Sequence, residues 1–137
     1  SYSYQLYNLA TLYREQALYH EAKPLVRQAI DIQMELGSEH ASVGFMIRTL
    51  ADIYSGQARY EEAEQLLTRA LEIFRNTLSV DEPVVGYVLR DLASMYIRLD
   101  RLDDAKYNLD LAFPIKNKSV KRARSSYNSH RNTDVKR

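Results

Sequence analysis

The chain has 137 residues, of which 45% are hydrophobic and 27% charged, with a formal net charge of +1, values that are ordinary for one soluble globular domain. It has no cysteine, which excludes disulfide frameworks, cysteine-ligated metal sites and thiol nucleophiles. It also has no apolar run near the roughly 18 residues that a membrane span needs and no secretory leader pattern, so we expect a cytoplasmic protein without membrane segments.

The first segment with a clear pattern begins at Leu9 and reads LATLYREQALYHEAKPLVRQAIDI. It starts close to the beginning of a chain that lacks an initiator methionine, so we expect a piece of a longer protein. Pro24 is expected in the first turn of the second helix of this segment, where a missing N–H is harmless because that group has no partner within the helix.

The second segment, LADIYSGQARYEEAEQLLTRALEI, begins 41 residues later at Leu50. Its apolar residues recur every three or four positions, which predicts helices over roughly 42–56 and 60–76, joined by the turn SGQARYE. Ala51 and Ala63 are small where these helices must approach closely. Tyr54 is expected to bury its ring and to keep its hydroxyl near a polar partner or solvent, as are its counterparts Tyr13 and Tyr96.

The third segment, LASMYIRLDRLDDAKYNLDLAFPI, begins 42 residues after the second, at Leu92. Three copies at this period predict stacked helical repeats, because one such unit cannot bury its apolar face alone. Pro114 falls late in the last helix, which should therefore end or kink near Phe113.

The motif Leu-Ala-x-x-Tyr, followed by a small alanine nine residues on, resembles the tetratricopeptide repeat (TPR), in the 42-residue variety of kinesin light chains and nephrocystin-type proteins. The resemblance implies an all-α, right-handed superhelical solenoid of three helix-turn-helix units at about 4–38, 42–80 and 84–113, within a domain of residues 1–115. Ala17, Ala58 and Asp100 replace the glycine that the family favours in the turn. If these positions need a positive φ, each alanine costs about 1 kcal/mol.

The resemblance also places the first helix of each unit on the concave wall of the solenoid. Residues five and two before the leading leucine, and two, five and six after it, share one face of such a helix. The predicted peptide-binding groove consists of Tyr4, Tyr7, Arg14, Phe45, Arg48, Asp52, Tyr87, Arg90, Ser94 and Arg98, flanked by Thr11, Glu15, Ser55, Gly56 and Ile97. Aromatic side chains beside arginines predict a peptide or helix with an aromatic or aliphatic anchor and carboxylates. The resemblance to kinesin light chains implies short tryptophan-acidic motifs.

Two alternatives remain open for these residues. The aromatic side chains can pack on the second helix of the preceding unit, and Arg48 and Arg90 can pair with Asp52 or Asp91 on a solvated face. The alternative function is an assembly module, in which apolar residues at 2–12 and after Leu109 stack on further repeats or on another copy.

The last 22 residues differ in charge from the body. Residues 1–115 carry 11 basic and 17 acidic side chains, whereas 116–137 carry eight and one. We expect a flexible or partly helical tail that is a linker, a nuclear-localisation or polyanion-binding segment at 121–124, or a phosphorylation site at Ser125 or Ser126. A nucleic-acid partner would depend on this tail alone, and we do not expect one.

No motif in the chain carries catalytic chemistry. His20, His40 and His130 have no partner at metal-ligand spacing. The acidic pairs Glu61-Glu62 and Asp103-Asp104 fit the first turn of a helix better than a catalytic dyad. We expect a non-enzymatic adaptor with a protein or peptide partner, no small-molecule substrate, no cofactor and no metal.

Overall fold

The computed structural model describes residues 1–37, 40–79 and 81–114. The helices are α1 (Tyr2–Glu15), α2 (Tyr19–Glu35), α3 (Ala41–Gly56), α4 (Tyr60–Thr77) and α5 (Pro83–Arg98). Residues 102–114 are also helical, and no strand occurs within the described ranges. The helices predicted at 42–56 and 60–76 are thus confirmed to within one residue.

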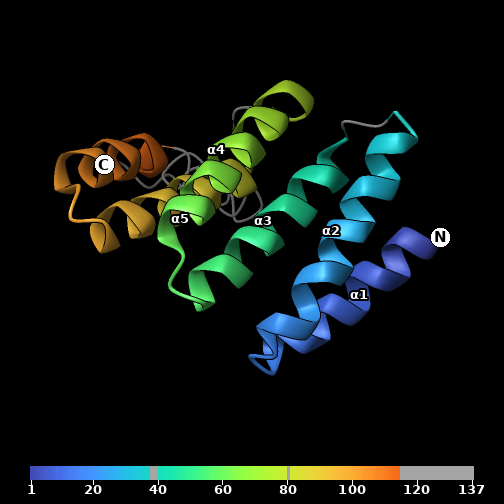
Figure 1. Ribbon diagram of the computed structural model, residues 1–137. Helices are drawn as coiled ribbons and strands as arrows, with labels where there is room; N and C mark the ends of the chain where they lie inside the picture. Colours follow the sequence, from blue (N-terminus) through green and yellow to red (C-terminus); the bar gives the residue numbers. More distant parts are fainter. Residues whose placement is uncertain (38–39, 80, 115–137) are drawn as a thin grey trace, which may run out of the picture.

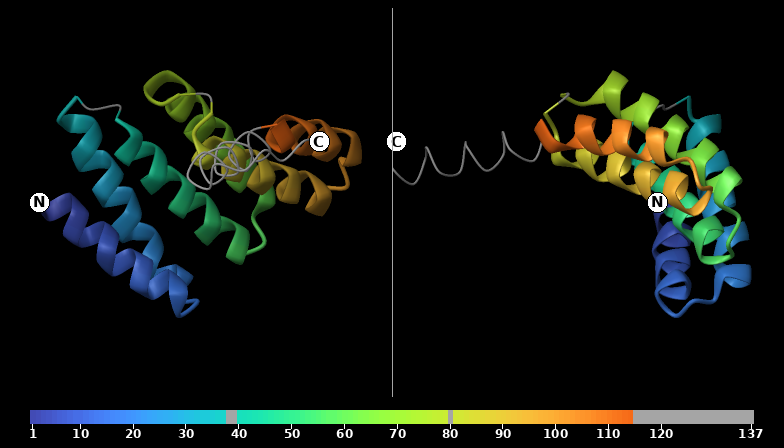
Figure 2. Two further views of the ribbon diagram at one scale, coloured as in Figure 1. Left: turned by 180° about the vertical axis from the view of Figure 1, so that it is seen from behind. Right: turned by 90° about the vertical axis from the view of Figure 1, so that its left-hand side faces the viewer.

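The helices form pairs that stack in chain order (Figure 1). Helix α1 packs on α2 and α3 packs on α4, while contacts of α2 with α3 and of α4 with α5 join one pair to the next. In the right-hand view of Figure 2 the stack bends into an arc. The predicted all-α repeat solenoid is therefore confirmed.

The turn inside each pair uses a left-handed residue. The φ angles are 60° at Ala17, 60° at Ala58 and 58° at Asp100. In the first turn the Ala17 N–H donates to the Arg14 carbonyl at 2.9 Å, which closes the end of α1. The expectation that these positions need a positive φ is confirmed, and each alanine carries a cost of about 1 kcal/mol relative to glycine.

Small residues set the distance between helices. Ala51 and Ala63 are fully buried, as their spacing predicts. A Cβ atom added at Gly44 would lie 2.7 Å from Cε1 of Phe74, one of the largest buried side chains. Helix α3 therefore approaches α4 at a distance that only glycine permits at this position.

The repeated tyrosine lies between consecutive units. Tyr54 is buried and its hydroxyl accepts a hydrogen bond from Arg27. Tyr96 is half-buried and donates to Oε1 of Glu64 at 3.0 Å. The prediction of a buried ring with a polar partner is confirmed for Tyr54, whereas Tyr96 and Tyr13 are only half-buried.

The predicted place of Pro24 is wrong. Helix α2 begins at Tyr19, so Pro24 is its sixth residue and lies beyond the first turn. The Ala22 N–H already bonds to the Leu18 carbonyl, which shows that the hydrogen-bond ladder starts before the proline. Pro24 consequently deprives the His20 carbonyl of its helical donor.

Other predictions concern charge pairs and chain ends. Glu61 and Glu62 lie in the first turn of α4, as expected. Pro114 is the last described residue and is still helical. The predictions for the tail, including Ser125, Ser126 and His130, lie outside the described residues.

Two searches of the described residues return nothing. No helix there is long and apolar enough to cross a membrane. No group of three or more His, Cys, Asp or Glu side chains in that part of the chain is arranged to hold a metal ion.

Candidate partner-binding groove

The first helices of the three units line a shared hollow of about 420 Å³. Tyr7 and Arg14 enter it from α1, whereas Phe45, Arg48 and Asp52 enter from α3. Helix α5 contributes Asp91, Ser94 and Met95, and α4 contributes the buried Leu67. The hollow therefore combines a polar wall with an apolar base, and six of the ten predicted groove residues meet in it.

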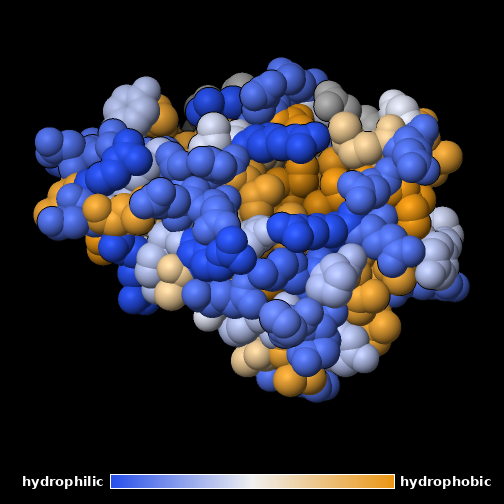
Figure 3. Space-filling view, in the orientation of Figure 1, coloured by the Kyte–Doolittle hydropathy of each residue, from blue (hydrophilic) through white to orange (hydrophobic). Residues whose placement is uncertain are grey.

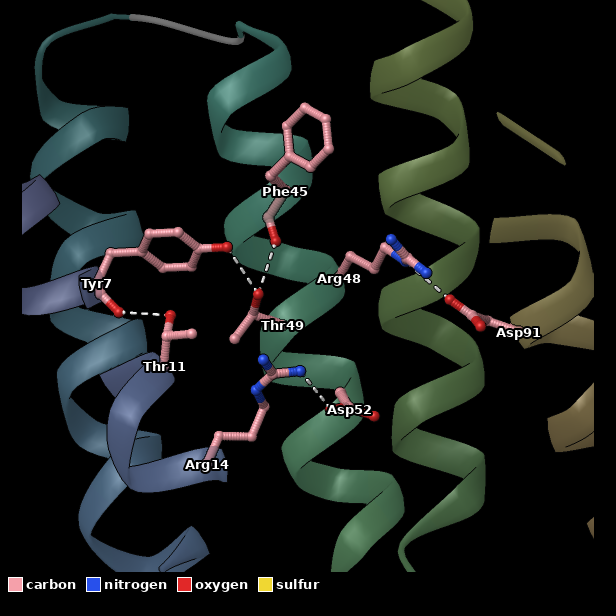
Figure 4. A network of polar contacts seen from close by, with 8 residues as sticks. All are labelled: Tyr7, Thr11, Arg14, Phe45, Arg48, Thr49, Asp52 and Asp91. Carbon is pink, nitrogen blue, oxygen red and sulfur yellow. Dashed lines mark hydrogen bonds and ion pairs between the residues drawn. The ribbon is translucent and has the colours of Figure 1, made fainter. Parts of the chain in front are cut away.

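A hydrogen-bond chain joins α1 to α3 across the hollow (Figure 4). Tyr7 Oη lies 2.8 Å from Thr49 Oγ1, and Thr49 Oγ1 donates to the Phe45 carbonyl at 3.1 Å. Because Thr49 has one hydroxyl hydrogen, Tyr7 is the donor to Thr49. This contact fixes the Tyr7 ring beside the exposed Phe45.

Ion pairs join the same helices further along. Arg14 of α1 pairs with Asp52 of α3 at 2.7 Å, and Arg48 of α3 pairs with Asp91 of α5 at 2.8 Å. In Figure 4 both arginines point along the wall toward the helix of the next unit. The alternative interpretation was thus correct in part, because Arg48 does pair with Asp91.

These contacts follow the repeat register and form what we call the polar ladder: Tyr7–Thr49 and Arg48–Asp91. In each rung the residue two before the leading leucine of one unit contacts the residue one before the leading leucine of the next unit. Arg90 occupies the donor position of the third unit, is exposed, and has no ion pair among the described residues. It is therefore the uncompensated cation at the end of the ladder.

The groove is less basic than the sequence count indicates. Asp91 was not among the predicted groove residues, although it lines this hollow and neutralises Arg48. The available signal was its position directly before the leading leucine, which Thr49 shares and which also faces the groove. Arg98 stacks over the Tyr60 ring at 5.7 Å instead of pointing at the hollow.

A second hollow of about 440 Å³ adjoins the first along α5. Its lining includes Tyr87, Arg90 and Ile97, with Leu109 from the last helix. Tyr87 is 49% exposed, and the guanidinium of Arg48 lies 5.9 Å from its ring centroid. This hollow therefore offers an exposed aromatic ring beside the free Arg90.

The aromatic residues do not pack as the alternative interpretation supposed. Phe45 lies edge-to-face against Phe74 of its own unit, with ring centroids 4.9 Å apart, and it is still 42% exposed. Tyr4 is exposed and lines neither hollow. Gly56 contributes to packing, because a Cβ there would lie 2.3 Å from the Tyr19 ring.

A family model described as Tetratricopeptide repeat matches residues 2–76 and 46–118 of this chain. The chain belongs to the tetratricopeptide repeat family. Repeats of this family generally mediate protein–protein interactions and are typically non-enzymatic scaffolds. No curated protein sequence matches the chain.

Solved TPR structures share the fold. A kinesin light chain-type protein of Podospora anserina with nearly identical TPR-like repeats is 28% identical, with a TM-score of 0.74, and the match covers 84% of this chain and 55% of that one. This TPR chain thus spans about half the length of that relative.

Two more distant TPR structures are similar in fold alone. BtubC (BKLC) from P. vanneervenii is 21% identical with a TM-score of 0.72, over 83% of this chain and 45% of that one. The TPR domain of Arabidopsis FLU is 16% identical with a TM-score of 0.76, over 85% of this chain and 95% of that one.

Proposed function

We propose that this TPR segment is a non-enzymatic, cytoplasmic adaptor that binds a peptide or a partner helix in its concave groove. The observation that carries the proposal is the hollow of about 420 Å³ lined by α1, α3 and α5. Its polar side chains are already held in place by the ladder, so little side-chain entropy is lost when a ligand binds. The exposed rings of Phe45 and Tyr87 supply apolar contact area at its edges.

The charges of the groove support one arrangement of the ligand. Within the first hollow, Arg14 and Arg48 are balanced by Asp52 and Asp91, so an aromatic or aliphatic anchor suits it better than a carboxylate. A carboxylate suits the second hollow, where Arg90 lacks a partner among the described residues. We therefore propose a ligand whose anchor lies near Phe45 and whose acidic residue contacts Arg90.

A peptide titration tests this proposal. Fluorescent acidic peptides with and without an aromatic residue are titrated into the wild type, Arg90→Glu and the control Arg75→Glu, an equal charge change on the exposed face of α4. A charge-assisted hydrogen bond is worth about 1.5–3 kcal/mol, so Arg90→Glu should weaken binding by about tenfold or more. The control should bind like the wild type, and equal binding by all three proteins would place the ligand elsewhere.

The exposed ends of the stack favour a second role, end-to-end assembly with another copy. Leu109 is 45% exposed, whereas Leu67, its equivalent one unit earlier, is 3% exposed. At the other end Leu12 is 55% exposed, whereas its equivalent Ile53 is fully buried. Residues that join neighbouring units inside the stack are thus uncovered at both ends, and a head-to-tail copy would cover them.

Sedimentation of complementary variants tests this second role. The wild type should form larger species as its concentration rises, while Leu12→Asp and Leu109→Asp should each remain monomeric. An equimolar mixture of the two variants should give dimers, because each retains one intact end. Monomeric wild type at all concentrations, or a mixture without dimers, would exclude head-to-tail assembly.

A further inference from the structure

Two equivalent junctions between units differ in charge. Tyr54 and Tyr96 occupy the same repeat position and each packs near the second helix of the preceding unit, α2 for Tyr54 and α4 for Tyr96. By the same register Lys23 corresponds to Glu64, and Arg59 corresponds to Arg101. The chain therefore contains its own reference for what surrounds this tyrosine.

The junction at Tyr96 is balanced. The Tyr96 hydroxyl donates to Glu64 at 3.0 Å, and Arg101 lies over the ring at 4.6 Å from its centroid. Arg101 also pairs with Asp104 at 2.9 Å and lies 3.9 Å from Glu64. Burial, followed by the hydrogen bond to Glu64, raises the pKa of Tyr96, so its hydroxyl stays protonated and available as a donor.

The junction at Tyr54 carries an excess of cations. Lys23 Nζ, Arg59 and Arg27 lie 4.8, 5.0 and 5.6 Å from the centroid of the one Tyr54 ring. Glu62 is the one acidic side chain in an ion pair with this cluster among the described residues, and it pairs with Arg59. Three cations thus converge where a single carboxylate is present.

The Tyr54 hydroxyl also has an unused hydrogen. It accepts a hydrogen bond from Arg27, and its own O–H has no acceptor among the described residues. At Tyr96 the corresponding O–H donates to Glu64, but at Tyr54 the equivalent position is Lys23, which has no acceptor atom. An acceptor with negative charge is therefore what this junction lacks relative to its counterpart.

The cations affect one another. The pKa of Lys23 lies below its usual value, first because of desolvation and then because of repulsion by Arg59 and Arg27, with Glu62 acting in the opposite direction. Bringing a counter-charge to this cluster would relieve that repulsion.

We propose that the cluster of Lys23, Arg27, Arg59 and the Tyr54 hydroxyl binds a phosphate group. The three cations exceed the one carboxylate by two charges, and a phosphate monoester carries about −1.5 to −2 at neutral pH, with three strong acceptor oxygens. Those oxygens can accept from the guanidinium groups, the ammonium group and the Tyr54 O–H together. Tyr54 lines neither groove hollow, so this site is separate from the proposed peptide groove.

Amide-resolved NMR titration with sodium phosphate at constant ionic strength tests the site. In the wild type, phosphate should shift the resonances of α2 and of the α3–α4 turn in a saturable way, and sodium acetate should not. Lys23→Glu supplies the carboxylate that Glu64 provides at the other junction, so this variant should lose the saturable shift. The control Arg75→Glu, which makes the same charge change elsewhere, should retain it.

Two further measurements separate the possible outcomes. Arg27→Gln removes one cation without adding an acid and should weaken phosphate binding several-fold, and a phosphoserine peptide against its unphosphorylated form distinguishes a peptide-borne phosphate from the free ion. Saturable shifts by either source that depend on Lys23 and Arg27 support the site. No saturable shift with both probes, equal shifts in Lys23→Glu, or equal binding of acetate would overturn it.

Discussion

Four residues of this chain adopt the left-handed backbone region, and they are of different types. Gly37 has a φ of 72°, while Ala17, Ala58 and Asp100 lie near 60°. Glycine adopts this region without steric cost, whereas the Cβ of alanine approaches the following carbonyl oxygen. Backbone strain is thus present in at least two turns whose place in the sequence could be predicted from the repeat alone.

Exchanging glycine and alanine at these positions should change stability in opposite directions. Ala58→Gly should stabilise the fold by about 0.5–1 kcal/mol, because it removes the left-handed cost. Gly37→Ala should destabilise it by about 1 kcal/mol, and a clash cannot explain that loss, because nothing lies within 4 Å of the added Cβ. Urea unfolding measures both, and a destabilised Ala58→Gly would mean that strain does not limit this turn.

The helices of this chain were predictable because helix position depends on a local pattern. The apolar spacing from Ala63 to Phe74 repeats every three to four residues and matches the buried side of α4. The start of α2 was not predictable to a residue, since no side-chain cap marks it and Leu18 serves as its N-cap. For this reason Pro24 was expected in the first turn, although it lies past it.

Replacing Pro24 tests the energetic consequence of that position. Pro24→Ala restores the N–H donor to the His20 carbonyl and should stabilise the fold by up to about 3 kcal/mol. Pro83→Ala is the matched control, because Pro83 is the first residue of α5, where no helical partner is lost, and its effect should stay within about 0.5 kcal/mol. Thermal unfolding compares the two, and equal shifts would show that α2 already compensates for the missing bond.

Across the whole molecule, the polar ladder couples one unit to the next. The groove residues were predictable in position, since Tyr7, Phe45 and Arg48 do line one hollow. Their charge state was not, because Asp91 neutralises Arg48 from a helix 43 residues further along the chain. A single-unit pattern cannot reveal such pairing, which depends on how far one unit is displaced along the next.

Breaking one rung should change the groove more than the stability. Asp91→Asn removes the charge that holds Arg48, and an ion pair this exposed contributes only about 0–1 kcal/mol to folding. The freed Arg48 should then bind an acidic peptide more tightly, by roughly three- to tenfold at low salt. Asp110→Asn, which breaks an equally local pair with Lys106 on the last helix, should leave peptide affinity unchanged. Unchanged affinity in Asp91→Asn would mean that the ligand does not reach Arg48.

The stacking order also determines how the molecule responds to mechanical load. The helix-to-helix contacts join only consecutive helices, apart from a minor contact between α1 and α3, and no wall runs the length of the arc. A tension applied to the two ends would therefore be carried in series through the α2–α3 and α4–α5 interfaces. Such a chain extends like a spring and then yields unit by unit, so a partner seated across two units would act as a clamp that raises the force needed to separate them.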